Sequence, residues 1–216
     1  MPLEDQLQRR LEARLTNIVV PDPGGPRLVD DARRLLALTR AIAPLSPASV
    51  LSTTDHDAIA VVCYAVQLPF CTPGPATIGK LGVTPLRERC EQSARLLVEQ
   101  LGETIDESLL DRAVRILLEI PEKSPVQDEA RLLADAINLE DFGVSGVLIQ
   151  AARLATIGRG IRLVLEAFDQ RERYGYWDAR LHDGFHFESS RQLARQRLTA
   201  ARQTVAALKQ ELAAQG

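Results

Sequence analysis

The chain has 216 residues, 45% of them hydrophobic, which is enough to enclose one substantial core and too few for a second full domain to be expected. A formal net charge of −3 and a pI near 5.7 provide no overall attraction to nucleic acid or to an anionic membrane, so neither is expected as a partner. The longest apolar run, Ala58 to Val66, is far shorter than the roughly 20 residues that a membrane-spanning helix needs.

In the first third of the chain, apolar spacing predicts three helices. Leucines every three or four residues place a helix within residues 1–20, and a similar stripe places the next one over 30–43. The segment 57–68 is almost wholly apolar and does not alternate as a half-buried strand would, so we predict a buried central helix. The prolines and glycines of 69–85 then predict an irregular loop.

The middle of the chain carries two further helical patterns. An apolar stripe over 86–101 predicts a helix that ends at Gly102, a residue suited to the left-handed conformation. Thr104 and Glu107 have the spacing of a capping box, which predicts the start of another helix that continues to Ile120.

The last part of the chain contains helical patterns and one interruption. Helices are expected over 127–139, 143–154 and 163–172, and a long final helix over 188–214. Six of the chain's aromatic side chains lie between residues 168 and 187, and we interpret that segment as an aromatic-rich loop. Because no segment alternates between apolar and polar residues, the expected fold class is all-α.

The N-terminus and the cysteines indicate the compartment in which the protein is expected. The N-terminus mixes acidic and basic residues where a secretory signal would have a basic stretch followed by an apolar block. Cys63, Cys71 and Cys90 are odd in number and show no CxxC spacing. We expect reduced thiols, with Cys63 and Cys90 in the core, and a cytoplasmic location.

The most distinctive segment is RLLADAINLEDFGVSG at 131–146. It resembles the fourth signature segment of small stand-alone bacterial HD-domain phosphohydrolases, an apolar pair followed by DADRLDAxGxxG. The matching positions are those of the family's metal-binding aspartate, its leucine, its second-to-last aspartate and its two glycines: Asp135, Leu139, Glu140, Gly143 and Gly146. Ile137 departs from the pattern.

Other segments are similar to this family in the same order. DDARRLLALTRAIA looks like the family's HxxRVxxxAxxIA helix, with Arg34 kept and Asp31 in place of the first metal-ligand histidine. ESSRQLARQRLTAARQTV is similar to the closing helix, ETAKxIAxxRxxFM. The resemblance implies a single-domain helical bundle of the HD-domain/phosphodiesterase-like type over 1–216, with its core at 30–154.

The His-Asp pair for which the family is named is missing from its expected place. There the run VVCYAV leads into Gln67 and Leu68. A literal pair occurs at His56 and Asp57, but it precedes the apolar run, about 15 Å away at 1.5 Å per residue. We interpret this pair as part of a helix start capped by Asp55 or Asp57, and its use as the true motif remains the alternative.

The resemblance implies a polar central pocket without an efficient metal site. Its expected residues occupy the family's signature positions: Asp31, Arg34, Gln67, Leu68, Asp135 and Glu140. Leu68 has no lone pair for a cation, so no metal is expected. The alternative is a divalent ion such as Mn, Mg, Fe or Ni held by Asp31, His56, Asp57 and Asp135. For Asp135 two interpretations stand, a residual metal or phosphate site, and a structural carboxylate paired with Arg34 or capping a neighbouring helix.

The expected function is therefore that of a catalytically degenerate relative of HD-domain phosphohydrolases, whose pocket binds a small anionic ligand or has a regulatory role. One alternative is an active metal-dependent phosphohydrolase that acts on a nucleotide or another phosphoester. A second alternative is a protein-interaction module that uses the aromatic segment 174–187. Its partner-contacting or lid residues would be Tyr174, Tyr176, Trp177, His182 and His186.

Overall fold

A computed structural model describes most of the chain, and every regular element in the described part is helical. The described residues are 3–17, 28–70, 85–156 and 158–214. The predicted all-α class is confirmed for these residues, and none of their helices is long and apolar enough to cross a membrane. The chain divides into two compact units, residues 1–134 and 135–216. The single-domain organisation stays a prediction.

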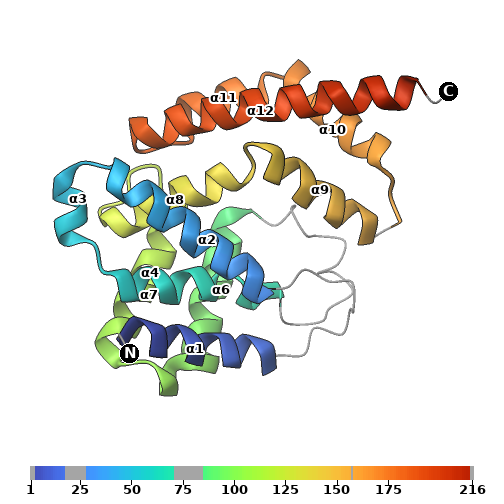
Figure 1. Cartoon of the computed structure of the whole chain (residues 1–216). Coiled ribbons are helices and arrows are strands. Elements are labelled where there is room, and N and C mark those ends of the chain that lie inside the picture. Colours follow the sequence, from blue (N-terminus) through green and yellow to red (C-terminus); the bar gives the residue numbers. More distant parts are fainter. Residues whose placement is uncertain (1–2, 18–27, 71–84, 157, 215–216) are drawn as a thin grey trace. The chain divides into compact units, whose positions relative to one another are not determined.

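The first unit is a set of helices assembled around α4 (Figure 1). Its α-helices are α1 (Leu3–Asn17), α2 (Leu28–Ile42), α3 (Ala48–Thr53), α4 (His56–Ala65), α6 (Leu86–Leu101) and α7 (Glu107–Glu119). Short 3-10 turns follow three of them, η1 (Ala43–Leu45), η2 (Leu68–Phe70) and η3 (Gly102–Thr104). The helix α8 (Asp128–Glu140) begins in this unit and ends in the second.

The predicted buried central helix is α4. All eight residues from Ala58 to Ala65 are buried, and α4 packs against α1, α2, α6 and α7. Such a helix is apolar on every side because it has no solvent face, which explains the absence of a helical stripe in its sequence. Asp55 accepts a hydrogen bond from the Ala58 amide at 3.0 Å, so the predicted cap at this helix start is confirmed.

Polar side chains join α1, α2 and α4 at one point of the first unit. Arg33 donates to both carboxylate oxygens of Glu12, at 2.8 and 2.7 Å, and the buried Tyr64 hydroxyl donates to Glu12 at 2.6 Å. The hydrogen bond from Arg33 lowers the pKa of Glu12 to about 2. This carboxylate is therefore ionised at every physiological pH and fixes the three helices to one another.

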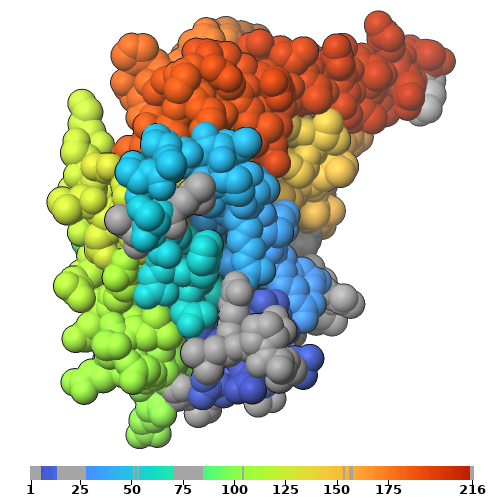
Figure 2. All heavy atoms as spheres, turned by 60° about the vertical axis from the view of Figure 1, so that its left-hand side comes forward, coloured from blue at the N-terminus to red at the C-terminus, as the bar shows by residue number. Residues whose placement is uncertain are grey.

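The second unit contains the end of α8 and four more helices, α9 (Val144–Thr156), α10 (Ile161–Arg173), α11 (Tyr176–Asp183) and α12 (Glu188–Ala213). The helices α9 and α10 pack together, and α12 contacts both α9 and α11 (Figure 1). In the space-filling view the side chains of α12 form a continuous strip along this unit (Figure 2). The long final helix predicted over 188–214 is confirmed.

The prediction of an aromatic-rich loop over 168–187 is wrong for most of that segment. Phe168 lies in α10, and residues 176–183 form α11. The rings of Phe142 and Trp177 lie 5.1 Å apart, those of Phe142 and Phe185 5.6 Å, and those of Phe168 and Trp177 5.6 Å. These four side chains are buried and form the aromatic cluster, which is the core of the second unit.

Several local predictions also need correction. Gly102 has right-handed helical dihedrals and continues into η3, so it is not a left-handed helix end. The N-cap of α7 is Asp106, two residues after the predicted Thr104, and its side chain accepts from the Ser108 amide at 3.0 Å. The helix α3 had no counterpart among the predicted elements. Cys63 and Cys90 are buried free thiols as predicted, whereas Cys71 and most of the 69–85 loop lie outside the described residues.

Candidate functional site

Asp135 is a fully buried carboxylate in the second half of α8. It accepts a hydrogen bond from the His186 amide on one oxygen, at 2.7 Å, and from the Phe187 amide on the other, at 3.1 Å. These two amides immediately precede the first residue of α12, Glu188. Asp135 thus satisfies two backbone donors at the entry to α12, and it caps a neighbouring helix, as one of its two interpretations predicted.

The pKa of the Asp135 carboxyl lies above its ordinary value. Burial raises its pKa to about 6, while the hydrogen bonds from the His186 and Phe187 amides act in the opposite direction. The amides stabilise the ionised form but do not fully replace the water that was removed. The charge on this side chain therefore changes close to neutral pH.

The backbone requires glycine at two positions after Asp135, one in the turn that follows α8 and one in the first turn of α9. Gly143 has a φ of +92°, and a Cβ atom there would lie 3.2 Å from the Cβ of Arg197. A Cβ atom on Gly146 would lie 2.5 Å from the carbonyl oxygen of Asp141, closer than real Cβ contacts. Both glycines of the 131–146 segment thus have a backbone reason for their presence, independent of any ligand.

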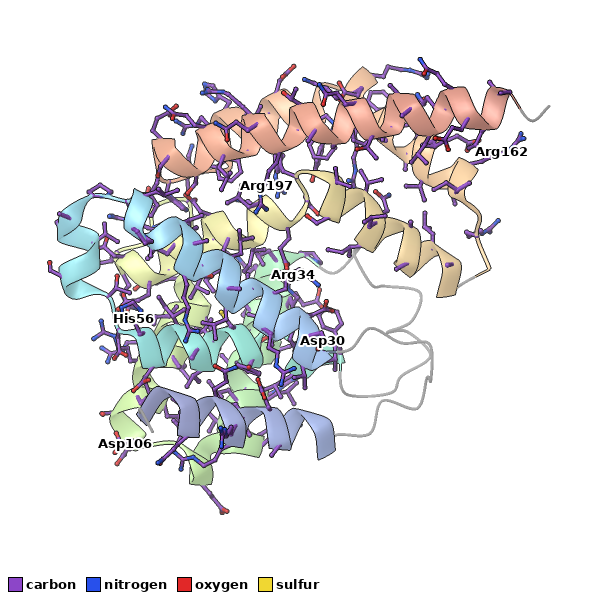
Figure 3. The ribbon with its side chains drawn as sticks, in the orientation of Figure 1. Asp30, Arg34, His56, Asp106, Arg162 and Arg197 are labelled. Carbon is purple, nitrogen blue, oxygen red and sulfur yellow. The ribbon has the colours of Figure 1, made fainter. Side chains whose placement is uncertain are left out.

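Arg197 of α12 is a polar residue near this turn that the sequence patterns did not single out. Its side chain extends toward the end of α8 and donates to the Leu139 carbonyl at 3.4 Å (Figure 3). Burial lowers the pKa of its guanidinium. Only the packing distinguishes Arg197 from the other arginines of α12.

The remaining residues of the predicted pocket are divided between the units. Asp31, Arg34, Gln67 and Leu68 belong to the first unit, whereas Asp135 and Glu140 belong to the second. Arg34 donates to Asp31 at 2.6 Å within α2. Leu68 is fully buried in η2, and Gln67 beside it is also buried. Glu140 is the last residue of α8 and is partly exposed. The pocket itself stays a prediction.

The alternative metal ligands His56 and Asp57 are the first two residues of α4. His56 is exposed and Asp57 is partly exposed, at the end of α4 opposite Gln67 and Leu68 (Figure 3). Within the residues that the structure describes, no three His, Cys, Asp or Glu side chains are grouped so as to hold a metal ion. The expectation of a site without metal stays a prediction.

The predicted partner or lid residues have different environments. Trp177 is 2% exposed and belongs to the aromatic cluster, whereas Tyr174 is 79% exposed. Tyr176 packs edge-on against Trp177 and lies beneath the guanidinium groups of Arg171 and Arg180. His182 is exposed beside Asp183, and His186 contributes its backbone amide to Asp135. A partner could reach Tyr174 and His182 directly, but Trp177 only by opening the core.

The described residues define the chain as an all-helical protein whose most buried acid caps a helix. No protein-family model, curated protein or solved structure gives a significant match to this chain.

Proposed function

We propose that this protein is a catalytically inactive relative of the HD-domain phosphohydrolases, in which the position of the metal-binding aspartate serves as a helix cap. The observation that carries the proposal is the pair of hydrogen bonds from the His186 and Phe187 amides to the two oxygens of Asp135. Each oxygen of this buried carboxylate already has a donor, so its burial is explained without a cation.

The chemistry at the other signature positions supports the same proposal. Hydrolysis at an HD site needs lone-pair donors that converge on one or two divalent cations, which activate a water and withdraw charge from the phosphoryl group. Leu68 stands where the resemblance places a metal-ligand aspartate, and its side chain, which has no lone pair for a cation, is fully buried. Asp31 stands at the first histidine position, and its carboxylate accepts a hydrogen bond from Arg34.

The function that remains for such a relative is binding or regulation, with a small anionic ligand as the expected partner. The competing proposal is an active phosphohydrolase with a divalent ion bound by Asp31, His56, Asp57 and Asp135. Both proposals place Asp135 at the centre, and they assign different roles to it. A substitution at Asp135 therefore separates them.

The test combines elemental analysis of the purified protein with assays of phosphomonoester, phosphodiester and nucleotide hydrolysis in Mn²⁺, Mg²⁺, Fe²⁺ and Ni²⁺. We expect no stoichiometric metal, and no hydrolysis that distinguishes the natural chain from Asp135→Asn. Asp128→Asn is the matched control, because Asp128 lies on the same helix and is paired with Arg131. Stoichiometric metal together with hydrolysis that is lost in Asp135→Asn and kept in Asp128→Asn would overturn the proposal.

A further inference from the structure

A cavity of about 510 Å³, open to solvent, lies on the second unit, and its lining does not include Asp135, His186 or Phe187. Residues of α11 and α12 line it: Asp178, Leu181, His182, Arg191 and Arg195. Its volume falls within the range of small-molecule sites, roughly 300–1,000 Å³. The lining combines two guanidinium groups, an imidazole and a carboxylate with one apolar side chain.

Arg191 is held in a fixed position at this cavity. Its Nε donates to the Leu181 carbonyl at 2.8 Å, and its Nη2 donates to the Phe185 carbonyl at 3.1 Å. Both acceptors are neutral backbone groups near the end of α11, so they orient the guanidinium without cancelling its charge. A positioned guanidinium loses little freedom when it binds an oxyanion, which favours recognition.

Glu188 shows that the two arginines can share one oxyanion. One of its carboxylate oxygens accepts from Arg191 and the other accepts from Arg195, the latter at 3.2 Å. The hydrogen bond from Arg191 lowers the pKa of Glu188. The Glu188 side chain is 54% exposed, and an ion pair in contact with water is weak because the solvent screens it. An incoming oxyanion can therefore displace it at small cost.

The charges at the cavity favour an anion over a cation. Two arginines and one aspartate line the cavity, so its guanidinium groups outnumber its carboxylates once Glu188 leaves the arginines. Asp178 also interacts electrostatically with Arg202, which does not line the cavity, and this further offsets its negative charge. The basic groups and Leu181 together suit a ligand with one charged end and one apolar part.

We infer that this cavity binds a small molecule that carries a carboxylate or phosphate group, with the oxyanion replacing Glu188 between Arg191 and Arg195. The apolar part of the ligand lies against Leu181. Guanidinium groups bind both kinds of oxyanion through paired, charge-assisted hydrogen bonds. The inference goes beyond the proposed function and does not depend on it, because Asp135 does not line this cavity.

The first experiment titrates the full chain by isothermal calorimetry, at constant ionic strength, with phenyl phosphate, benzoate and phenol. The three probes share a ring and differ in charged group. We expect saturable binding of phenyl phosphate or benzoate, at least about tenfold tighter than that of phenol. The tighter of the two charged probes identifies the oxyanion. Equal binding of all three probes, or saturable binding of none, would overturn the inference.

Three variants of α12 then test the location. Arg195→Gln removes a binding group and should weaken the charged probe about tenfold. Lys209→Gln is the matched control, because Lys209 is a partly exposed cation of the same helix that pairs with Asp169 and does not line the cavity, and it should leave affinity unchanged. Glu188→Gln removes the internal competitor and should tighten binding about threefold or more. Weaker binding by Glu188→Gln, or an equal loss in Arg195→Gln and Lys209→Gln, would contradict the inference.

Discussion

Two buried acids of α8 replace the hydration that their carboxylates lost on burial in different ways. Glu129 is 2% exposed and accepts from the Arg112 guanidinium at 2.5 Å and from the Asp55 amide at 2.8 Å. Asp135, six residues later, is fully buried and accepts from the two amides that precede α12. Glu129 is held by a partner of opposite charge, whereas Asp135 is held by backbone dipoles and keeps a raised pKa of about 6.

The difference shows what each side chain does for the protein. Glu129 joins α7 to the start of α4 through an ion pair, so its charge is the useful property. Asp135 supplies acceptors for donors that would otherwise be buried without partners, so its oxygens are the useful property and its charge is a cost. Substitutions that separate charge from acceptor oxygens therefore test the comparison.

The largest effect is expected from Asp135→Ala. The change leaves the His186 and Phe187 amides without acceptors and opens a small cavity, while it removes an unfavourable buried charge. Orphaned buried donors cost about 1–3 kcal/mol each, so we expect a net loss of about 3–4 kcal/mol in the free energy of unfolding. Urea denaturation at pH 7 measures this loss. A change below about 1 kcal/mol would show that the amides find other acceptors.

The pH dependence of stability gives the next effect. Because the folded-state pKa of Asp135, about 6, lies above its ordinary value of 3.8, the folded chain holds this proton more tightly than the unfolded chain does. The stabilisation from Asp135 is complete below the ordinary value and is lost as the pH rises through 6, by up to about 3 kcal/mol. Denaturation curves of the natural chain and Asp135→Asn, compared from pH 4 to pH 8, should diverge in this direction. Parallel curves would contradict it.

Replacing each acid by its amide of the same shape gives the sharpest comparison between Glu129 and Asp135. Glu129→Gln keeps an acceptor for the Asp55 amide but removes the closer of two acidic partners of Arg112, with the Asp55 carboxylate left at 3.7 Å, and we expect a loss of about 2 kcal/mol because Arg112 is partly exposed. Asp135→Asn removes the costly charge and keeps one acceptor, so at pH 8 its effect should be smaller, within about 1 kcal/mol. Denaturant midpoints of the two variants at pH 8 compare these values. The reverse order would show that Asp135 depends on a cation.

The smallest effect is expected at Asp128, a third acid of the same helix. It lies in the first turn of α8 and accepts from Arg131 at 3.1 Å, where both side chains contact solvent. Asp128→Asn should change the free energy of unfolding by no more than about 0.5 kcal/mol, measured under the same conditions. A loss as large as that of Glu129→Gln would mean that exposure does not explain the difference between the acids.

The helices with a clear apolar stripe could be predicted from the sequence to within a few residues, because burial of one face imposes the period. The central helix α4 and the burial of Asp135 were also predictable, from apolar content and from the residues that share its face. The helix α11 was not, because the flanking glycines and the aromatic side chains that build the core look like a loop in one dimension. The N-cap of α7 is Asp106, two residues after the predicted Thr104. A sequence pattern does not contain the backbone geometry that decides between two positions so close together.

The partners of Asp135 could not be predicted at all. His186 and Phe187 lie about fifty residues away in the sequence, and they contribute backbone amides, which no side-chain motif records. The cavity between α11 and α12 was missed for a related reason, since it depends on a helix that resembled a loop. Of its lining residues, His182 had been predicted as a contact for a partner.

The central claim, that Asp135 caps a helix and does not bind metal, is tested most directly by thermal unfolding of the natural chain and Asp135→Asn with increasing Mn²⁺. A ligand that binds only the folded state raises the midpoint of unfolding, and above its dissociation constant the rise grows with the logarithm of the ligand concentration. We predict that Mn²⁺ shifts the two midpoints equally or not at all. A rise in the natural chain that is absent in Asp135→Asn would contradict the claim.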